Sequence, residues 1–414
     1  MRITGEIRVP GDKSISHRAF MLGALAQGAT VVRGALESLD VRSTRRALET
    51  LGARIEKAGD AWRVTGGSLC EPAAVIDAGN SGTTARLLSG ICAGIEGVTV
   101  MTGDHSLVMR PMARVIQPLQ KMGASFLARR DRFLPMAIRG GGLSGITWDI
   151  DVSSAQVKSA LLLAGLKAQG VTTVSEPSLS RDHTERMLPY FGAQIERDGT
   201  TVRVRGPQSL SAREVQVPGD PSSAAFPAVW AAASKGSQIL LRDICLNPTR
   251  TGYIAVLRRM GARISIENIR EFSGEPVGDI FVAGGELEAA TIEGGEIPTL
   301  IDEIPVLAVA ACFAQGTTVI RDAGELRVKE TDRISALVQG LAALGAQVEE
   351  MPDGLIINGP LLLRAGSVRT FSDHRIAMAF SILAKIADIA VDIDDTECVD
   401  ISFPGFFQIM EGSR

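Results

Sequence analysis

Six segments of the chain repeat one order of polar and apolar positions. Each begins with a polar turn rich in glycine or serine, continues as an apolar run typical of a buried helix, and passes into a β-branched stretch. The six copies begin near Asp12, Asn80, Ser153, Asp220, Asp302 and Asp373. The pattern predicts six similar structural units that place six similar turns.

The second half of five units carries a further motif, in which an apolar residue and Gly-Ala precede a short alternating stretch. It occurs at residues 51–56, 122–126, 191–196, 260–267 and 344–350. Glycine at that point is typical of a helix C-terminus. Helices are therefore predicted upstream, at 43–51, 110–122 and 249–260. Each unit then contains a turn, helix, strand, helix and strand, with a further short strand, which predicts an α/β fold with helices packed on sheets. The polar segment 268–279 is predicted to be a surface loop.

One repeat divides the chain in two. The sequence Val-Pro-Gly-Asp at residues 9–12 recurs at residues 217–220, with three units before the second copy and three beginning with it. We expect two lobes, 12–217 and 1–11 plus 218–414, with hinges near 11–13 and 216–220. The alternative is a repeat scaffold without activity, although solenoid repeats are usually shorter, at roughly 20–50 residues.

The amino-acid composition excludes several classes of protein. The chain has 414 residues, 45% of them apolar but only 4% aromatic, so its cores must consist of Ala, Leu, Ile and Val. A net charge of −4 argues against a general nucleic-acid or anionic-membrane binder. The five cysteines are scattered, and no leader or membrane span is evident. We expect a cytoplasmic protein without nucleic-acid or membrane partners.

The first turn carries charges that its counterpart in the other lobe lacks. Ser14 is predicted to cap a helix, where free N–H groups bind anions, and Lys13 lies beside it. Arg18 follows four residues after Ser14, so it returns to the same face. The matched turn has Pro221 and Phe226 in place of Lys13 and Arg18. Because the scaffold does not require these charges, we interpret them as a carboxylate or phosphate clamp rather than an ordinary capped helix.

Weaker candidates occur at the second and third turns. They are Asn80, Gly82, Arg110, Ser154, Gln156, Ser180 and Arg181. Polar turns that open helices allow a ligand to approach the backbone closely. The polar turns are equally compatible with a polar cap or a surface loop, and a solitary arginine such as Arg110 is more often a surface residue.

The fifth and sixth turns place acids next to cations. Asp302 stands in an apolar setting and is either a plain N-cap or a base. Lys329 and Arg333 are four apart and are predicted to share one helix face, with Glu330 adjacent. This pattern also fits an exposed helix with ion pairs. Seven cations occupy turns or helix starts and suggest a heavily anionic substrate pair: Lys13, Arg18, Arg110, Arg181, Lys329, Arg333 and Arg375. The sequence contains no nucleotide-binding glycine motif or metal-ligand cluster, so we expect neither a metal nor a cofactor.

Motifs along essentially the whole chain resemble the EPSP synthase family, 3-phosphoshikimate 1-carboxyvinyltransferases. They are PGDKSISHRA, GNSGTT-R, RPM, SSAQVKSALLLAGL, SRDHTE, LRVKETDR and SDHRIAM. The resemblance implies a two-lobed inside-out α/β barrel, the enolpyruvyltransferase fold, with three βαβαββ repeats in each lobe. It also implies transfer of the enolpyruvyl group of phosphoenolpyruvate to shikimate 3-phosphate, as in the shikimate pathway towards chorismate and the aromatic amino acids.

The resemblance further implies roles for individual residues. Asp302 is the expected base and Glu330 the expected proton donor, while Lys13 reaches both substrates. Shikimate 3-phosphate is expected to contact Lys13, Ser14, Arg18, Ser154, Ala155, Gln156, Ser180, Arg181, Asp302 and Lys329. Phosphoenolpyruvate is expected to contact Lys13, Asn80, Gly82, Arg110, Gln156, Arg333, His374 and Arg375. The first lobe is thereby the shikimate 3-phosphate side and the second the phosphoenolpyruvate side.

Departures from the family pattern and rival families also bear on function. A lysine expected just before Phe403-Pro404 is absent, and Glu325 replaces an asparagine. Gly82 is retained, which implies sensitivity to the inhibitor glyphosate. The related UDP-N-acetylglucosamine 1-carboxyvinyltransferases usually carry a cysteine where this chain has His105. RNA terminal-phosphate cyclases share related units but do not fit the net acidity. The resemblance implies a monomer.

Overall fold

A computed structural model describes residues 1–412, which form two compact units. Unit 1 contains Met1–Pro10, Pro218–Arg270 and the chain from Pro276 onward. Unit 2 contains Gly11–Val217 and Glu271–Glu275. The chain thus leaves unit 1 after residue 10 and returns to it at residue 218.

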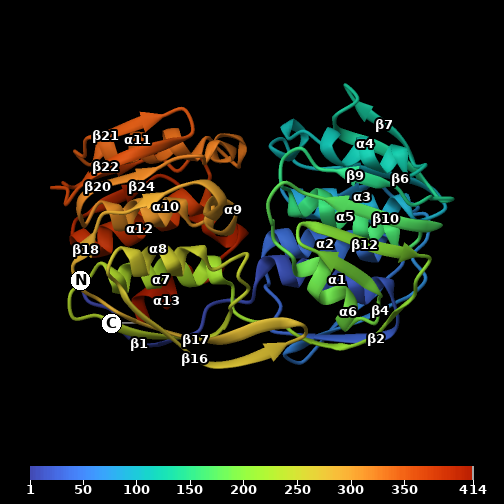
Figure 1. Ribbon diagram of the computed structural model, residues 1–414, viewed down its shortest axis with the longest axis horizontal. Helices are drawn as coiled ribbons and strands as arrows, with labels where there is room; N and C mark the ends of the chain where they lie inside the picture. The colour runs from blue at the N-terminus through green and yellow to red at the C-terminus, as the bar shows by residue number, and fades with distance from the viewer. Residues whose placement is uncertain (413–414) are drawn as a thin grey trace. The chain divides into compact units, whose positions relative to one another are not determined.

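Unit 2 contains three sheets, one for each of the first three repeats (Figure 1). The first sheet contains β2 (Ala26–Arg33), β3 (Arg54–Ala58), β4 (Ala61–Gly66), β13 (Leu210–Ser211) and β14 (Glu214–Gln216). The second contains β5 (Ile76–Asp77), β6 (Gly97–Thr102), β7 (Ser125–Arg129) and β8 (Phe133–Gly140). The third contains β9 (Thr147–Asp149), β10 (Gly170–Ser175), β11 (Ile195–Asp198) and β12 (Thr201–Gly206).

Two helices accompany each sheet of unit 2. The helices are α1 (Lys13–Leu25), α2 (Leu39–Thr50), α3 (Gly82–Ala93), α4 (Ala113–Lys121), α5 (Ala155–Gly165) and α6 (His183–Tyr190). The helices that follow the three polar turns are α1, α3 and α5, of which α3 packs against both of the others. Their starts are set by side-chain caps. Asp12 accepts from the Ile15 N–H at 2.8 Å, and Ser81 accepts from the Thr84 N–H at 3.1 Å.

Unit 1 repeats this architecture with a shortened last copy. Its first sheet contains β1 (Thr4–Ile7), β15 (Gln238–Cys245), β16 (Arg263–Phe272) and β17 (Glu275–Ala283), although Glu271–Glu275, where β16 ends and β17 begins, belong to unit 2. Its second contains β18 (Leu287–Glu288), β19 (Thr291–Ile292), β20 (Ala314–Ile320), β21 (Val348–Met351) and β22 (Gly354–Gly359). Within the described residues, its third has two strands, β23 (Gly366–Val368) and β24 (Val391–Ile393).

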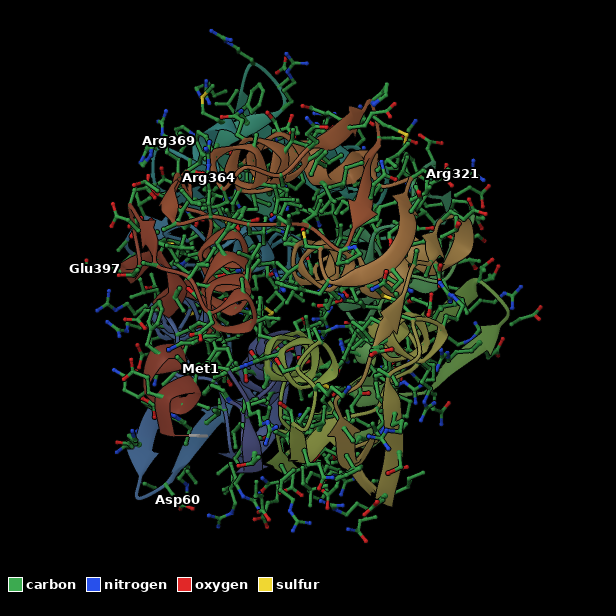
Figure 2. The ribbon with its side chains drawn as sticks, turned by 90° about the vertical axis from the view of Figure 1, so that its left-hand side faces the viewer. Met1, Asp60, Arg321, Arg364, Arg369 and Glu397 are labelled. Carbon is green, nitrogen blue, oxygen red and sulfur yellow. The ribbon has the colours of Figure 1, made fainter. Side chains whose placement is uncertain are left out.

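The helices of unit 1 form its apolar core. They are α7 (Pro221–Ala232), α8 (Gly252–Arg259), α9 (Ile297–Leu300), α10 (Ile304–Ala311), α11 (Arg333–Ala343), α12 (His374–Ala387) and α13 (Phe406–Gly412). Every residue of α7 and α10 is buried, and both helices pack against α12. A helix that is apolar on all sides is stable only when neighbours cover it completely. Charged side chains such as Arg321, Arg364 and Arg369 remain exposed at the surface (Figure 2).

The first sheet of each unit takes an edge strand from a distant part of the chain. In unit 1, β1 pairs in parallel with β15, joining Thr4 to Gln238 in register. In unit 2, β14 pairs in parallel with β2, joining Glu214 to Val31. Each added strand fills the position that the short strand before a turn occupies in the other repeats, so both sheets are completed by residues far away in sequence.

The loop predicted at 268–279 is wrong. Most of this segment belongs to β16 and β17, which form a long hairpin whose turn is limited to Ser273 and Gly274. Both turn residues have positive φ, 53° and 88° respectively, as tight hairpins require. Polar residues alternate along β16 because the strand is exposed on one face, and a polar alternating strand is easily mistaken for a loop. No helix among residues 1–412 is both long and apolar enough to cross a membrane.

Candidate active site

The α1 turn of unit 2 gathers Lys13, Ser14 and Arg18, but its cap differs from the predicted one. Asp12 rather than Ser14 caps the helix, which leaves the half-buried Ser14 hydroxyl outside the capping interaction. Lys13 Nζ lies 3.2 Å from Asp40 Oδ2 at the start of α2. Arg18 Nη1 donates to the Ser14 carbonyl at 3.0 Å, so the two residues share a face as the spacing predicted.

Arg18 lies at the buried base of this turn, where other helices fix it. Its Nε donates to Thr184 Oγ1 at 2.7 Å, and its Nη2 donates to Ser159 Oγ at 2.8 Å. Burial is the main cause that lowers the pKa of Arg18 to about 10; the charge of Arg181 contributes in the same direction, and nearby carboxylates oppose the shift. The guanidinium nevertheless stays charged at neutral pH, and its fixed orientation is suited to a bound anion.

A buried hydrogen-bond chain ties the starts of three helices together. His17 Nδ1 in α1 lies 2.6 Å from Thr44 Oγ1 in α2, which lies 2.6 Å from Thr84 Oγ1 in α3. Burial, followed by the charges of Lys13 and Arg18, lowers the pKa of His17 well below its usual value. A neutral imidazole therefore holds the first and second turns in a fixed relation.

The α3 turn brings together Asn80, Gly82 and Arg110. Arg110 Nη2 donates to Asn80 Oδ1 at 3.0 Å, and Asn80 Nδ2 donates to Asp104 Oδ2 at 2.6 Å. Gly82 is the first residue of α3, and a Cβ there would lie 2.9 Å from Arg86 Nη1 and 3.7 Å from Arg110 Nη1. Glycine thus allows two guanidinium groups to approach the helix start.

The α5 turn is joined to the α3 turn through Gln156. Its Oε1 accepts from Arg86 Nη1 at 2.6 Å, and its Nε2 donates to Thr83 Oγ1 at 3.1 Å. Ser154 is the N-cap, and Ala155 is the first residue of the helix. Gln156 therefore links the start of α5 to the start of α3 within unit 2.

Ser180 is held by a buried ionic cluster. Glu176 accepts from the Ser180 N–H at 2.9 Å and from its hydroxyl at 2.6 Å. Lys158 Nζ lies 2.5 Å from Glu176 and 2.7 Å from Glu185, and all three side chains are at most 2% exposed. Lys158 compensates both carboxylates, which would be costly to bury alone. Arg181, beside Ser180, is half-buried.

In unit 1, Asp302 is surrounded by the predicted cations. Its Oδ1 lies 3.2 Å from Arg333 Nη1 and 3.7 Å from Lys329 Nζ, and its Oδ2 lies 3.9 Å from Arg375 Nη2. The plain N-cap interpretation does not hold, because Glu303 occupies the N-cap position of α10. The Asp302 side chain is 13% exposed, so the carboxylate is paired yet accessible.

Arg333 is the centre of this cluster. Its Nε donates to Asp373 at 2.8 Å, its Nη1 to Asp302 at 3.2 Å and its Nη2 to Glu330 at 2.7 Å. Burial by itself would lower the pKa of Arg333, but Asp373, Glu330 and Asp302 outweigh it and raise that pKa. The guanidinium therefore remains ionised and fixes three carboxylates around it.

The predicted common helix face for Lys329 and Arg333 is wrong. Asp332 caps α11 by accepting from the Ser335 N–H at 3.1 Å, so the helix begins only at Arg333. Lys329 ends the 3-10 helix η3 (Gly324–Val328), and Glu330 lies in the loop between the two helices. His374 and Arg375 begin α12 and are both buried.

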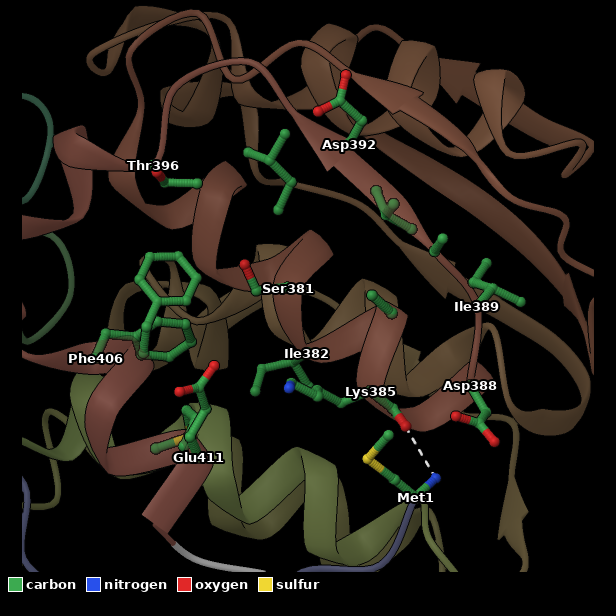
Figure 3. A pocket seen from close by; sticks show the side chains of 16 residues that line it. Met1, Ser381, Ile382, Lys385, Asp388, Ile389, Asp392, Thr396, Phe406 and Glu411 are labelled. Carbon is green, nitrogen blue, oxygen red and sulfur yellow. Dashed lines mark hydrogen bonds between the residues drawn. The ribbon is translucent and has the colours of Figure 1, made fainter.

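A pocket of about 600 Å³ elsewhere in unit 1 contains none of the predicted site residues. It lies among α12, β24, α13 and the N-terminus, and the Met1 ammonium donates to the Lys385 carbonyl at 2.9 Å (Figure 3). The lining is largely apolar, with Ile382, Ile389 and Phe406 among its members. It provides no cationic cluster for an anionic substrate.

Several residues that hold the site were missed by the sequence analysis. They are Asp40, Arg86, Glu176, Asp373 and Lys158. Arg86 could have been predicted from the sequence, because it follows Gly82 by four residues and so shares its helix face. Glu176 lies only four residues before Ser180. The ionic partners of Asp40, Lys158 and Asp373 lie 18 to 40 positions away in sequence, and no local pattern reveals them.

Comparison with known proteins gives a consistent result over the full chain. The family model described as EPSP synthase (3-phosphoshikimate 1-carboxyvinyltransferase) matches residues 1–410. The 3-phosphoshikimate 1-carboxyvinyltransferase of Desulforudis audaxviator is 52% identical, with 100% of this chain and 97% of the relative covered. That of a Synechococcus strain is also 52% identical, with coverage of 99% and 94%.

Comparison with solved structures gives the same result as comparison of the sequences. EPSP synthase from Acinetobacter baumannii superposes with a TM-score of 0.90 at 41% identity, covering 100% of this chain and 96% of that one. The enolpyruvyl transferase NikO from Streptomyces tendae gives a TM-score of 0.78 at 17% identity, covering 100% and 95%, and supports the fold alone. The predicted fold, family and transferase activity are confirmed. The chain belongs to the EPSP synthase family, the 3-phosphoshikimate 1-carboxyvinyltransferases.

Proposed function

We propose that the chain transfers the enolpyruvyl group of phosphoenolpyruvate to the 5-hydroxyl of shikimate 3-phosphate, with Asp302 as base and Glu330 as acid. The observation that carries the assignment is the position of Asp302, which has Arg333 at 3.2 Å, Lys329 at 3.7 Å and Arg375 at 3.9 Å. A carboxylate among three cations is suited to a reaction in which two anionic substrates must meet a base.

The chemistry requires two proton movements in the addition step and a third in the elimination step. Asp302 takes the proton of the 5-hydroxyl as the oxygen attacks the enol carbon of phosphoenolpyruvate, and Glu330 protonates the methylene carbon. The tetrahedral intermediate then loses phosphate from that carbon and a proton from the new methyl group, which restores the double bond. Arg333 and Arg375 hold the phosphate and carboxylate charges during both steps.

Glu330 acts as an acid only when its contact with Arg333 weakens. In the structure, Arg333 donates to Glu330 at 2.7 Å, and this pairing stabilises the ionised carboxylate. An arriving anionic substrate competes for the same guanidinium. Substrate binding would thereby free Glu330 to hold a proton at the time when one is needed.

The cluster in unit 2 is proposed to bind the substrate anions. Lys13, Ser14, Arg18, Ser154, Ala155, Gln156, Ser180 and Arg181 are assigned to shikimate 3-phosphate. Asn80, Gly82 and Arg110 are assigned to phosphoenolpyruvate, together with His374 of unit 1. Support comes from the hydrogen bonds that join Arg18 to α5 and α6 and Gln156 to α3, because preoriented donors bind anions at a smaller entropic cost.

The decisive experiment measures phosphate release from phosphoenolpyruvate with two acceptors in parallel. Release with shikimate 3-phosphate alone supports the proposed function. Release only with UDP-N-acetylglucosamine would assign the chain to the other carboxyvinyl transfer. No release with either acceptor would show that the folded chain is catalytically silent.

Glyphosate is expected to inhibit competitively with phosphoenolpyruvate, because no methyl group at residue 82 crowds the site. Gly82→Ala is expected to raise the inhibitory concentration by about ten-fold, since its Cβ would lie 2.9 Å from Arg86 Nη1 and displace that side chain. Gly285→Ala is the matched control, because nothing lies within 4 Å of a Cβ there. Absent or uncompetitive inhibition at millimolar glyphosate would contradict the prediction.

The chain crossings near residues 11–13 and 216–220 are proposed to act as a hinge between the units. We expect an open form to predominate in the free protein, because like charges on the turns of the two units would oppose closure without substrate. Small-angle scattering should show a smaller radius of gyration after both substrates, or shikimate 3-phosphate plus glyphosate, are added. Identical curves with and without ligands would argue against closure.

We also propose that the enzyme is a monomer located in the cytoplasm. All five cysteines are free thiols, and four of them are buried, which suits a reducing compartment. Light scattering of the eluted protein should give a mass near the chain mass of 43.8 kDa. A mass near twice that value would contradict the monomer.

A further inference from the structure

In unit 1, four buried polar side chains are connected by hydrogen bonds, and the last of them lies close to Arg375. Arg250 Nη2 donates to Asp220 Oδ1 and to Ser222 Oγ, each at 2.9 Å. Ser222 Oγ in turn donates to Glu303 Oε1 in a short hydrogen bond. Glu303 Oε1 lies 3.7 Å from Arg375 Nη1. The four residues behind Arg375 come from α7, the loop before α8 and the start of α10.

These residues are deeply buried. Asp220 is 6% exposed, Ser222 3%, Arg250 2% and Glu303 1%. A buried carboxylate persists only when partners compensate its charge. Glu303 has Arg375 at 3.7 Å and is connected to Arg250 through Ser222. The cluster therefore has little freedom to rearrange and holds Glu303 at a fixed distance from Arg375.

The start of α7 is the counterpart of the α1 turn in the internal duplication. Asp220 corresponds to Asp12, and both cap their helices. Ser222 corresponds to Ser14, yet it bonds to Glu303 within the protein core. The α7 turn lacks the Lys and Arg of its counterpart, but Ser222 connects it through Glu303 to Arg375.

Arg375 is placed between two acidic residues. Its Nη1 donates to the Asp302 carbonyl at 2.9 Å, and its Nη2 lies 3.9 Å from the Asp302 carboxylate. Without Glu303 at 3.7 Å on the other side, the guanidinium would be drawn fully onto Asp302. That movement would occupy the proposed base and turn the donors of Arg375 away from an incoming anion.

We propose that Glu303, held by Ser222 and Arg250, is a positioning residue that keeps Arg375 oriented for phosphoenolpyruvate. This inference rests on the proposed function, in which Arg375 binds that substrate. Glu303 itself touches no substrate. Its effect is transmitted through the orientation of Arg375. Changes at Glu303 should therefore weaken the binding of phosphoenolpyruvate and leave the binding of shikimate 3-phosphate unchanged.

Ser222→Ala is the sharpest test, because it removes the hydrogen bond to Glu303 without changing any charge. The KM for phosphoenolpyruvate is expected to rise by about ten-fold, as for a lost hydrogen bond to a charged group. The KM for shikimate 3-phosphate should stay within about two-fold of the wild-type value, because Arg375 is not assigned to that substrate. Both constants are obtained from phosphate release by the full chain.

Ser223→Ala is the matched control. Ser223 lies in the same helical turn and is also buried, with 5% exposure, so the variant loses an identical hydroxyl outside the chain of contacts to Arg375. Its KM values should equal those of the wild type. Glu303→Gln, which keeps volume but removes the charge, should raise the KM for phosphoenolpyruvate at least as much as Ser222→Ala.

The outcomes separate this inference from the proposed function. A wild-type chain that releases no phosphate would refute the proposed function first. With an active wild type, equal behaviour of Ser222→Ala and Ser223→Ala would overturn the positioning role. A parallel rise of both KM values in Ser222→Ala would also overturn it, because a general loosening of unit 1 would affect both substrates.

Discussion

Asp302→Asn is expected to lower kcat by about 10³-fold, the range typical of losing a general base. Asparagine has the same shape but cannot accept the proton of the 5-hydroxyl. The side chain contacts Arg333, Lys329 and Arg375, and replacing the carboxylate also removes the negative charge that they surround. Steady-state phosphate release at saturating substrates measures the effect directly.

The control for this variant is Asp322→Asn, an identical change at an exposed position of the same unit. It should leave kcat unchanged. Circular dichroism of both variants should match the wild type, since Asp302 is not a helix cap. A kcat for Asp302→Asn that stays within about ten-fold of wild type would assign the base to another group.

Arg333→Met should reduce the free energy of unfolding by about 3–5 kcal/mol, the range for removing one partner of a buried ion pair. Three carboxylates, on Asp302, Glu330 and Asp373, lose their common cation. Asp373 is fully buried, and the Arg333 side chain is 1% exposed, so water does not replace the lost partner. Urea unfolding followed by fluorescence and circular dichroism provides the measurement.

Activity of Arg333→Met should also fall, because the acid and the base both lose their positioning contact. Arg321→Met is the control, since Arg321 is 55% exposed and pairs with a similarly accessible Glu293. Surface ion pairs contribute little, so its unfolding midpoint should be nearly unchanged. Equal unfolding midpoints for the two variants would mean that groups other than Arg333 compensate the charges of the three carboxylates.

The sequence was sufficient to locate the chemistry but not its internal contacts. The comparison of Lys13 and Arg18 with Pro221 and Phe226 identified the charged turn, and the structure places Arg18 against α5 and α6. The same comparison used the α7 turn only as an uncharged reference and assigned it no role. That interpretation missed Glu303, because its bond to Ser222 spans 81 positions in the chain.

Helix positions also divide into those that the sequence predicted and those that only the structure could locate. The 110–122 and 249–260 predictions match α4 and α8 to within a few residues, since apolar periodicity and a terminal glycine are local signals. The cap of α1 and the start of α11 were misplaced, because Asp12 and Asp332 compete with Ser14 and Lys329 for those positions. Local composition permits either choice, and only the packed backbone selects one.

The sequence by itself determined the six repeats, the enolpyruvyltransferase family and the cations at the turns, because these depend on residue type and spacing along the chain. Tertiary structure alone decided which acid each cation meets. Arg333 joins residues 31 and 40 positions away, and Arg375 reaches one 73 positions away. Such pairings depend on which helices pack together and how far water is excluded between them. Burial therefore distinguishes Arg333, which holds the site together, from arginines of the same charge on the surface.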